Sequence, residues 1–180
     1  MNILDTILDA QNGAAVTRAG SQAGLAPDQT AAALSVLVPA LAAGFQRNMQ
    51  SQDGLQSLMT ALTAGNHGWY LDNPASLTDP SAVQEGNGIL GHLLGNKEVS
   101  RAIATRAAAQ TGLSDAALKR LLPLAATMMM AAFAKQSRRG ASLPRTNGGI
   151  AAMLTPLLDQ NRDGSIADDV ASMIGRFVKP

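Results

Sequence analysis

The sequence predicts an all-helical fold, a multihelical bundle built around two long buried helices. Of its 180 residues, 46% are hydrophobic and 15% are charged, a balance that suits one or two packed domains. Two runs, 31–45 and 121–134, hold no charged residue, and apolar side chains occupy nearly every side of both. Helices of this kind are surrounded by other helices. Pro39 and Pro123 lie within the runs and predict a kink in each central helix.

The first helical unit is expected to span residues 1–64. It begins with a short helix near 3–8, followed by a second helix, the Gly24-Leu25 turn and the long helix that contains Pro39. One more amphipathic helix is expected from near Ser51 to Gly65, because four apolar residues recur there at helical spacing: Leu55, Leu58, Met59 and Leu62.

Residues 65–87 are expected to form a long connecting loop. They are rich in Gly, Asn, Asp and Pro, which are typical of turns. They also hold the single Trp and the single Tyr of the chain, Trp69 and Tyr70.

The second helical unit, 88–136, indicates an internal duplication of the first. When the first half is shifted by 88 positions, Gly24-Leu25 falls on Gly112-Leu113, and the same shift matches other positions: Thr17-Arg18-Ala19 with Thr105-Arg106-Ala107, Gln22 with Gln110, Leu34 with Leu122, Leu41 with Met129, and Phe45 with Phe133. This period is too long for a solenoid repeat, so the two units are expected to pack as one pseudo-symmetric domain.

Two segments complete the chain. Residues 137–149 contain Arg138, Arg139 and Arg145 together with Gly and Pro, which is typical of a flexible basic linker. Residues 150–180 are expected to form an EF-hand-like loop and a terminal helix. The buried stripe of that helix recurs at helical spacing: Ile166, Val170, Met173, Ile174 and Phe177.

The loop within this last segment predicts a calcium site. Asp159, Asn161 and Asp163 stand at loop positions one, three and five, where alternate side chains turn inward. They offer oxygens to a cation that takes roughly six to eight of them. Gly164 follows at the sharp turn. We therefore expect Ca²⁺ as a cofactor, bound by Asp159, Asn161, Asp163, Ser165 through its carbonyl, and Asp169.

The closing position of this loop departs from the calcium pattern. A bidentate Glu normally closes the site, but this chain has Val170, which belongs to the buried stripe. Asp169, or else Asp168, would then close a loop that is one residue shorter. The alternative is a turn without metal, in which Ser165 caps the last helix and the two aspartates favour its positive end.

Five motifs spread over nearly the whole chain point to one family. They are Met1-Asn2-Ile3-Leu4-Asp5, the Gly-Leu-Ala-Pro-Asp-Gln turn at 24–29, Tyr70-Leu71-Asp72-Asn73-Pro74, the stretch from Gly88 to Gly95 that contains His92, and the Asp-rich terminal loop. Together they resemble a bacterial YidB-like family, filed as Domain of Unknown Function 937. The resemblance implies an all-helical bacterial protein and supplies no activity. It favours Asp169 as a ligand, because the family's terminal loop often has acids there.

No group of residues predicts an enzyme. Only His67 and His92 could act as a base near neutral pH, and neither lies in a nucleophile motif. His67 is expected to anchor the long loop, and His92 to be partly buried and hydrogen-bonded. The eight Met residues are expected to fill the core. The absence of Cys excludes disulfides and thiol nucleophiles.

The remaining expectations concern partners and location. Residues 97–145 hold nine basic and two acidic residues, which leaves nonspecific binding of nucleic acid or an acidic partner as an alternative. The apolar runs are shorter than the about 20 residues that span a bilayer, so no membrane span is expected. The N-terminus lacks a secretory signal, which favours the cytoplasm. We expect a non-enzymatic structural or protein-binding module, whose partner is an unknown protein or a second copy of itself.

Overall fold

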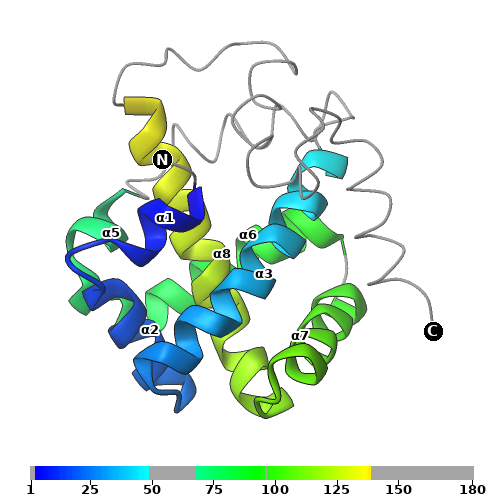
Figure 1. Cartoon of the computed structure of the whole chain (residues 1–180). Coiled ribbons are helices and arrows are strands. Elements are labelled where there is room, and N and C mark those ends of the chain that lie inside the picture. The colour runs from blue at the N-terminus through cyan, green and yellow to red at the C-terminus, as the bar shows by residue number, and fades with distance from the viewer. Residues whose placement is uncertain (1–2, 49–67, 96, 139–180) are drawn as a thin grey trace, which may run out of the picture.

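The computed structural model describes residues 3–48, 68–95 and 97–138, and every regular element within them is a helix (Figure 1). This confirms the predicted all-helical bundle. The elements are α1 (Ile3–Leu8), α2 (Ala14–Ala23), α3 (Pro27–Asn48), α5 (Trp69–Asp72), the 3₁₀ helix η1 (Pro74–Thr78), α6 (Pro80–Leu94), α7 (Lys97–Thr111) and α8 (Asp115–Arg138).

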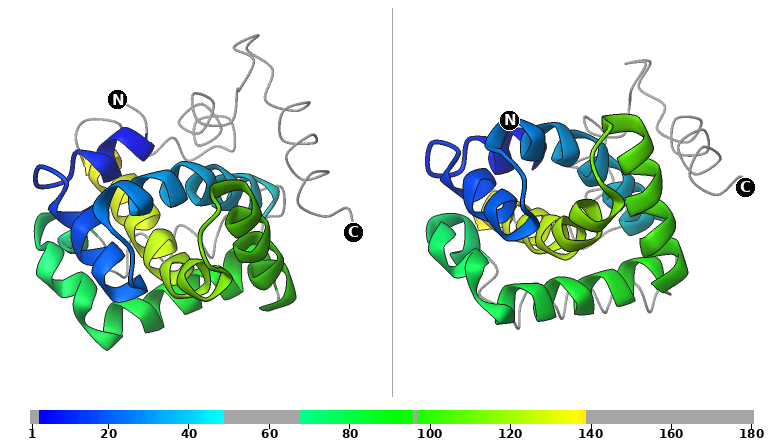
Figure 2. Two further views of the ribbon diagram at one scale, coloured as in Figure 1. Left: turned by 60° about the horizontal axis from the view of Figure 1, so that its bottom comes forward. Right: turned by 90° about the horizontal axis from the view of Figure 1, so that it is seen from below.

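Helix α8 is the centre of the bundle. Every residue from 121 to 134 is buried, and α1, α2, α3, α5, α6 and α7 all contact the helix (Figures 1 and 2). Met128, Met129 and Met130 are among the buried residues, so their predicted role as core residues is confirmed. The two long helices α3 and α8 contact each other, and Phe45 packs against Phe133 with 5.5 Å between ring centroids.

Glycine residues and polar side chains determine where the helices begin and end. Gly24 ends α2 at φ 75°, and the Leu25 N–H donates to the Gly20 carbonyl at 2.8 Å. Only glycine adopts this left-handed conformation without strain. At the start of α3 the Gln29 side chain accepts from the Ala26 N–H at 3.1 Å, and at the start of α8 the Ser114 hydroxyl accepts from the Ala117 N–H at 3.2 Å. Each bond satisfies a donor that the helix itself leaves unpaired.

Helix α6 crosses α8 with almost no space between the two backbones. A Cβ atom at Gly86 would lie 2.0 Å from the carbonyl oxygen of Pro123. In the same crossing, the Thr127 hydroxyl lies 2.8 Å from the Ala82 carbonyl oxygen and 3.2 Å from that of Pro123. The missing side chain at position 86 therefore sets the distance between α6 and the central helix.

The prediction of a loop over 65–87 is wrong for the residues of this range that the structure describes, 68–87. Residues 69–72, 74–78 and 80–87 are helical. Pro74 and Pro80 stand in the first turns of η1 and α6, where a missing N–H costs no hydrogen bond. Leu71, Leu77 and Ala82 are fully buried, so the segment packs on the bundle instead of passing over it.

Two described helices are long and apolar enough to cross a membrane by length and composition, Pro27–Arg47 and Asp115–Lys135. Both helices are longer than the uncharged runs within them, because each helix continues through the polar residues at its ends. However, 56% and 83% of their most apolar windows are buried inside the protein. The core helix of a soluble protein passes the same test, so length and composition alone do not make either helix a membrane span.

Several predictions concern residues outside those described. They are the helix expected from Ser51 to Gly65, the linker from residue 139 to 149, and the calcium-like loop and terminal helix at 150–180. The predicted linker begins at residue 137, but Ser137 and Arg138 belong to α8. Pro39 and Pro123 both lie inside continuous helices.

Candidate binding corner around Trp69

Trp69 is the only exposed large hydrophobic side chain among the described residues. It retains 51% of its accessible surface, whereas the neighbouring Leu71 is fully buried. Both belong to α5, a helix of four residues that lies at one end of the molecule in all views (Figures 1 and 2). Leu71 thus anchors the helix in the core, and Trp69 is left facing solvent.

Polar contacts hold α5 in place from both sides. Lys135 near the end of α8 donates from Nζ to Asp72 Oδ1 at 2.5 Å. Gln11, in the turn between α1 and α2, donates from Nε2 to the Asp72 carbonyl oxygen at 3.3 Å. The Asn73 N–H bonds the Trp69 carbonyl at 2.7 Å. Two separate segments, together with the cap of α5 itself, therefore hold the helix that carries Trp69.

Tyr70 turns toward the start of α6. Partial burial raises the pKa of its phenol, and the hydrogen bond to the Glu85 carboxylate raises it further, while a bond with Ser81 lowers it. Asp79 adds a small electrostatic increase. The phenol therefore stays protonated and joins α5 to α6.

Four carboxylates lie on α5 or on segments that contact it or its flanking residues. Asp72 lies in the helix, Asp79 and Glu85 lie beside Tyr70, and Asp9 lies in the turn whose Gln11 bonds Asp72. Lys135 neutralises one of these carboxylates. We call Trp69 together with Asp9, Asp72, Asp79 and Glu85 the Trp69 corner. An exposed indole with carboxylates on neighbouring segments suits a partner that offers an apolar or planar cationic group.

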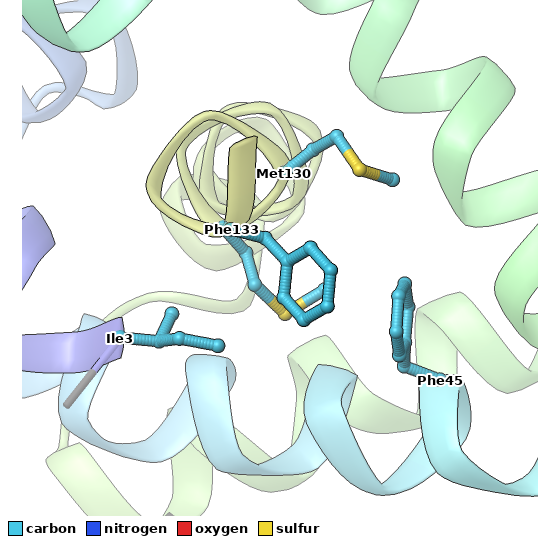
Figure 3. A pocket seen from close by; sticks show the side chains of 5 residues that line it. Ile3, Phe45, Met130 and Phe133 are labelled. Atoms are coloured by element: carbon cyan, nitrogen blue, oxygen red, sulfur yellow. The ribbon is translucent and has the colours of Figure 1, made fainter. Parts of the chain in front are cut away.

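An apolar hollow lies among α1, α3 and α8 (Figure 3). It has no room for a water molecule and is lined by Ile3, Phe45, Met129, Met130 and Phe133. These side chains are at most 3% exposed and present no polar group that could orient a ligand. The hollow is therefore part of the core packing, and the soft Met side chains partly fill it.

The chain matches the model of one protein family. The model of the bacterial protein of unknown function DUF937 matches residues 5–136. The chain belongs to this family. No curated protein and no solved structure matches the chain.

Two of the motifs that resemble DUF937 proteins lie on α5 and α6. Tyr70-Leu71-Asp72-Asn73-Pro74 forms α5 and the start of η1, so its Asp72 is the carboxylate that pairs with Lys135. The stretch from Gly88 to Gly95 forms the last turns of α6 and its left-handed cap. His92 is on the helix as expected, but it is exposed instead of partly buried.

The predicted metal ligands lie outside the described residues of this DUF937 protein. They are Asp159, Asn161, Asp163, Ser165 and Asp169, and the alternative ligand Asp168 and His67 lie outside them as well. Within 3–48, 68–95 and 97–138, no group of three or more His, Asp or Glu side chains could hold a metal ion.

Sequence reasoning found Trp69 but placed it in a loop. The sequence signal for the correct structure is a leucine followed three residues later by a proline: Leu71 before Pro74 and Leu77 before Pro80. Both leucines are buried, and both prolines begin a helix.

Proposed function

We propose that this DUF937 protein is a non-enzymatic helical module that binds a protein partner through the Trp69 corner. The observation that carries the proposal is Trp69 itself, half exposed on a helix that Asp72, Lys135 and Gln11 hold in place. A rigid exposed Trp loses little conformational entropy when a partner covers it, and Trp is enriched among residues that dominate binding energy.

A site-specific cross-link tests this proposal. A photoreactive phenylalanine analogue replaces Trp69 in bacterial cells, and the matched control carries the same analogue at Arg47, an exposed position on α3. We expect a discrete cross-linked species from position 69 that position 47 does not give. Equal labelling at both positions, or none at 69, would show that the corner meets no partner.

The calcium site stays part of the proposal. Its support is the spacing of Asp159, Asn161 and Asp163, with Ser165 and Asp169 as further ligands. A single unpaired loop of this kind binds weakly, with Kd roughly 0.1 to 1 mM. Calcium would order the terminal helix and so change protein stability or the surface that a partner meets.

We also propose that the two helical units arose by duplication. Under the shift of 88 positions, the last residue of α2 falls on the last residue of α7, and the first residue of α3 falls on the first residue of α8. Gly24 and Gly112 occupy equivalent turns, with φ of 75° and 71°. The prolines do not correspond under this shift, and the kinks expected at Pro39 and Pro123 remain predictions.

Binding of nucleic acid or an acidic partner through the basic region 97–145 is the alternative function. Lys97, Arg101 and Arg120 are exposed. Acidic residues interrupt this surface: Arg101 pairs with Glu98 at 2.7 Å, and Lys119 pairs with Asp115 at 2.5 Å. Such pairing weakens attraction to a phosphate backbone, so this region supports nucleic-acid binding less than the corner supports a protein partner.

A further inference from the structure

Charge is divided between two ends of the molecule. The Trp69 corner carries Asp9, Asp72, Asp79 and Glu85. The other end carries exposed basic residues of α7 and the first turns of α8, which we call the basic face: Lys97, Arg101, Lys119 and Arg120. Glu98 and Asp115 also lie there and pair with Arg101 and Lys119, so the face has a net charge of plus two. Helices α5 and α7 lie at opposite ends in both views of Figure 2.

The basic face is built across the junction of α7 and α8. Thr105 Oγ1 donates to Asp115 Oδ1 at 2.6 Å, which fixes the two helices side by side at that point. Arg101 stands about one turn before Thr105, and Lys119 about one turn after Asp115, so both project from the same junction. Their side chains remain 61% and 45% exposed despite their ion pairs.

We propose that the partner of the Trp69 corner is a second copy of this chain, which offers its basic face. This inference rests on the proposed function and names its partner. The acidic groups of the corner complement the basic residues, and an arginine guanidinium can stack on the exposed indole ring of Trp69. Arg101 and Arg120 are the two arginines of the basic face.

The placement of the two surfaces determines the kind of assembly. A contact between different surfaces at opposite ends is heterologous, so it builds a head-to-tail ring or chain. Exposed ion pairs contribute little individually, and salt screens them. Trp69 therefore supplies most of the binding energy, and the charges supply orientation and association rate.

Sedimentation velocity of the purified full chain tests this proposal. At low ionic strength the mean sedimentation coefficient is expected to rise with protein concentration, and at 1 M salt, where the screening length is about 3 Å, the rise is expected to disappear. Trp69→Ala is expected to weaken association about thirty-fold, the loss typical of a dominant interface residue. The double variant Arg101→Glu and Arg120→Glu is expected to be monomeric.

Mixing the variants distinguishes this contact from others. The Trp69→Ala chain keeps an intact basic face, and the double arginine variant keeps an intact corner, so an equal mixture is expected to form a one-to-one complex. A symmetric contact between two corners would not give this complementation. The control variant reverses the charge of two exposed arginines outside both surfaces, Arg18→Glu and Arg47→Glu, and is expected to associate like the wild type.

Two results overturn the proposal. The first is a purified protein that stays monomeric at every concentration and low salt, and the second is association that Trp69→Ala and the arginine variants leave unchanged. If a monomeric protein still gives the cross-link from position 69 in cells, the proposed function stands and its partner is a different protein. If neither association nor the cross-link is seen, both proposals fail.

Discussion

Replacing Gly86 by alanine should separate α6 from the central helix. The new Cβ would lie 2.0 Å from the Pro123 carbonyl oxygen, far inside the 3.4 Å at which ordinary contact begins, and 2.9 Å from the Pro123 Cα. These are backbone atoms, so no side-chain rotation relieves the clash. Overpacking of this kind costs about 1 to 3 kcal/mol, and we expect the upper end. Alanine regains about 0.5 to 1 kcal/mol through its preference for helix.

The net expectation is a loss of about 2 kcal/mol, which lowers the Tm by about 4 to 8 °C for a chain of this size. Gly88→Ala is the matched control, because position 88 lies on the same helix and a Cβ there meets no atom within 4 Å. This variant should gain about 0.5 to 1 kcal/mol. Urea unfolding followed by helical circular dichroism measures both. A Gly86→Ala protein as stable as the Gly88→Ala protein would refute the tight crossing.

Three further predictions follow from the corner and the terminal loop. The single tyrosine, Tyr70, should titrate above its ordinary pKa near 10 in ultraviolet absorbance, and Glu85→Gln should lower that pKa only in part, since burial is the larger cause. Because the folded state holds this proton more tightly, the contribution of Tyr70 to stability should be constant below a pH of about 10 and be lost as the pH rises through the folded pKa. Asp72→Asn, which removes the half-exposed pair with Lys135, should cost less than about 1 kcal/mol in urea unfolding; a larger loss would mean that α5 depends on this pair for folding. Calorimetry should detect about one equivalent of bound calcium, together with a melting shift that Asp163→Ala removes; no heat at several times the expected Kd would reduce the loop to a helix cap.

The sequence was sufficient to predict the helical class and the positions of the two core helices. An uncharged run with apolar residues on nearly every side leaves no polar face for solvent, and α8 is accordingly buried from residue 121 to 134. Gly24 and Gly112 predicted turns, and both adopt the left-handed conformation that such turns need. These features depend on local chemistry, which a sequence expresses directly.

The segment around Trp69 could not be predicted in the same way. Its helices are too short to show periodicity, and their stability comes from burial of Leu71 and Leu77 against distant parts of the chain. The ion pair between Asp72 and Lys135 joins residues 63 positions apart. The exposure of His92 likewise depends on which side of α6 meets α8, and the Gly86 crossing decides that side.

The most direct test of the account uses Trp69 as the single tryptophan of the chain. Its fluorescence is quenched with caesium and with iodide ions, and each value is compared with that of a free tryptophan analogue, first in dilute protein. The account predicts efficient quenching in which caesium exceeds iodide, because acidic groups attract the cation, and it predicts protection from both ions as protein concentration rises at low salt. A tryptophan that neither ion reaches in dilute protein, or that iodide quenches better, would contradict an exposed acidic binding corner.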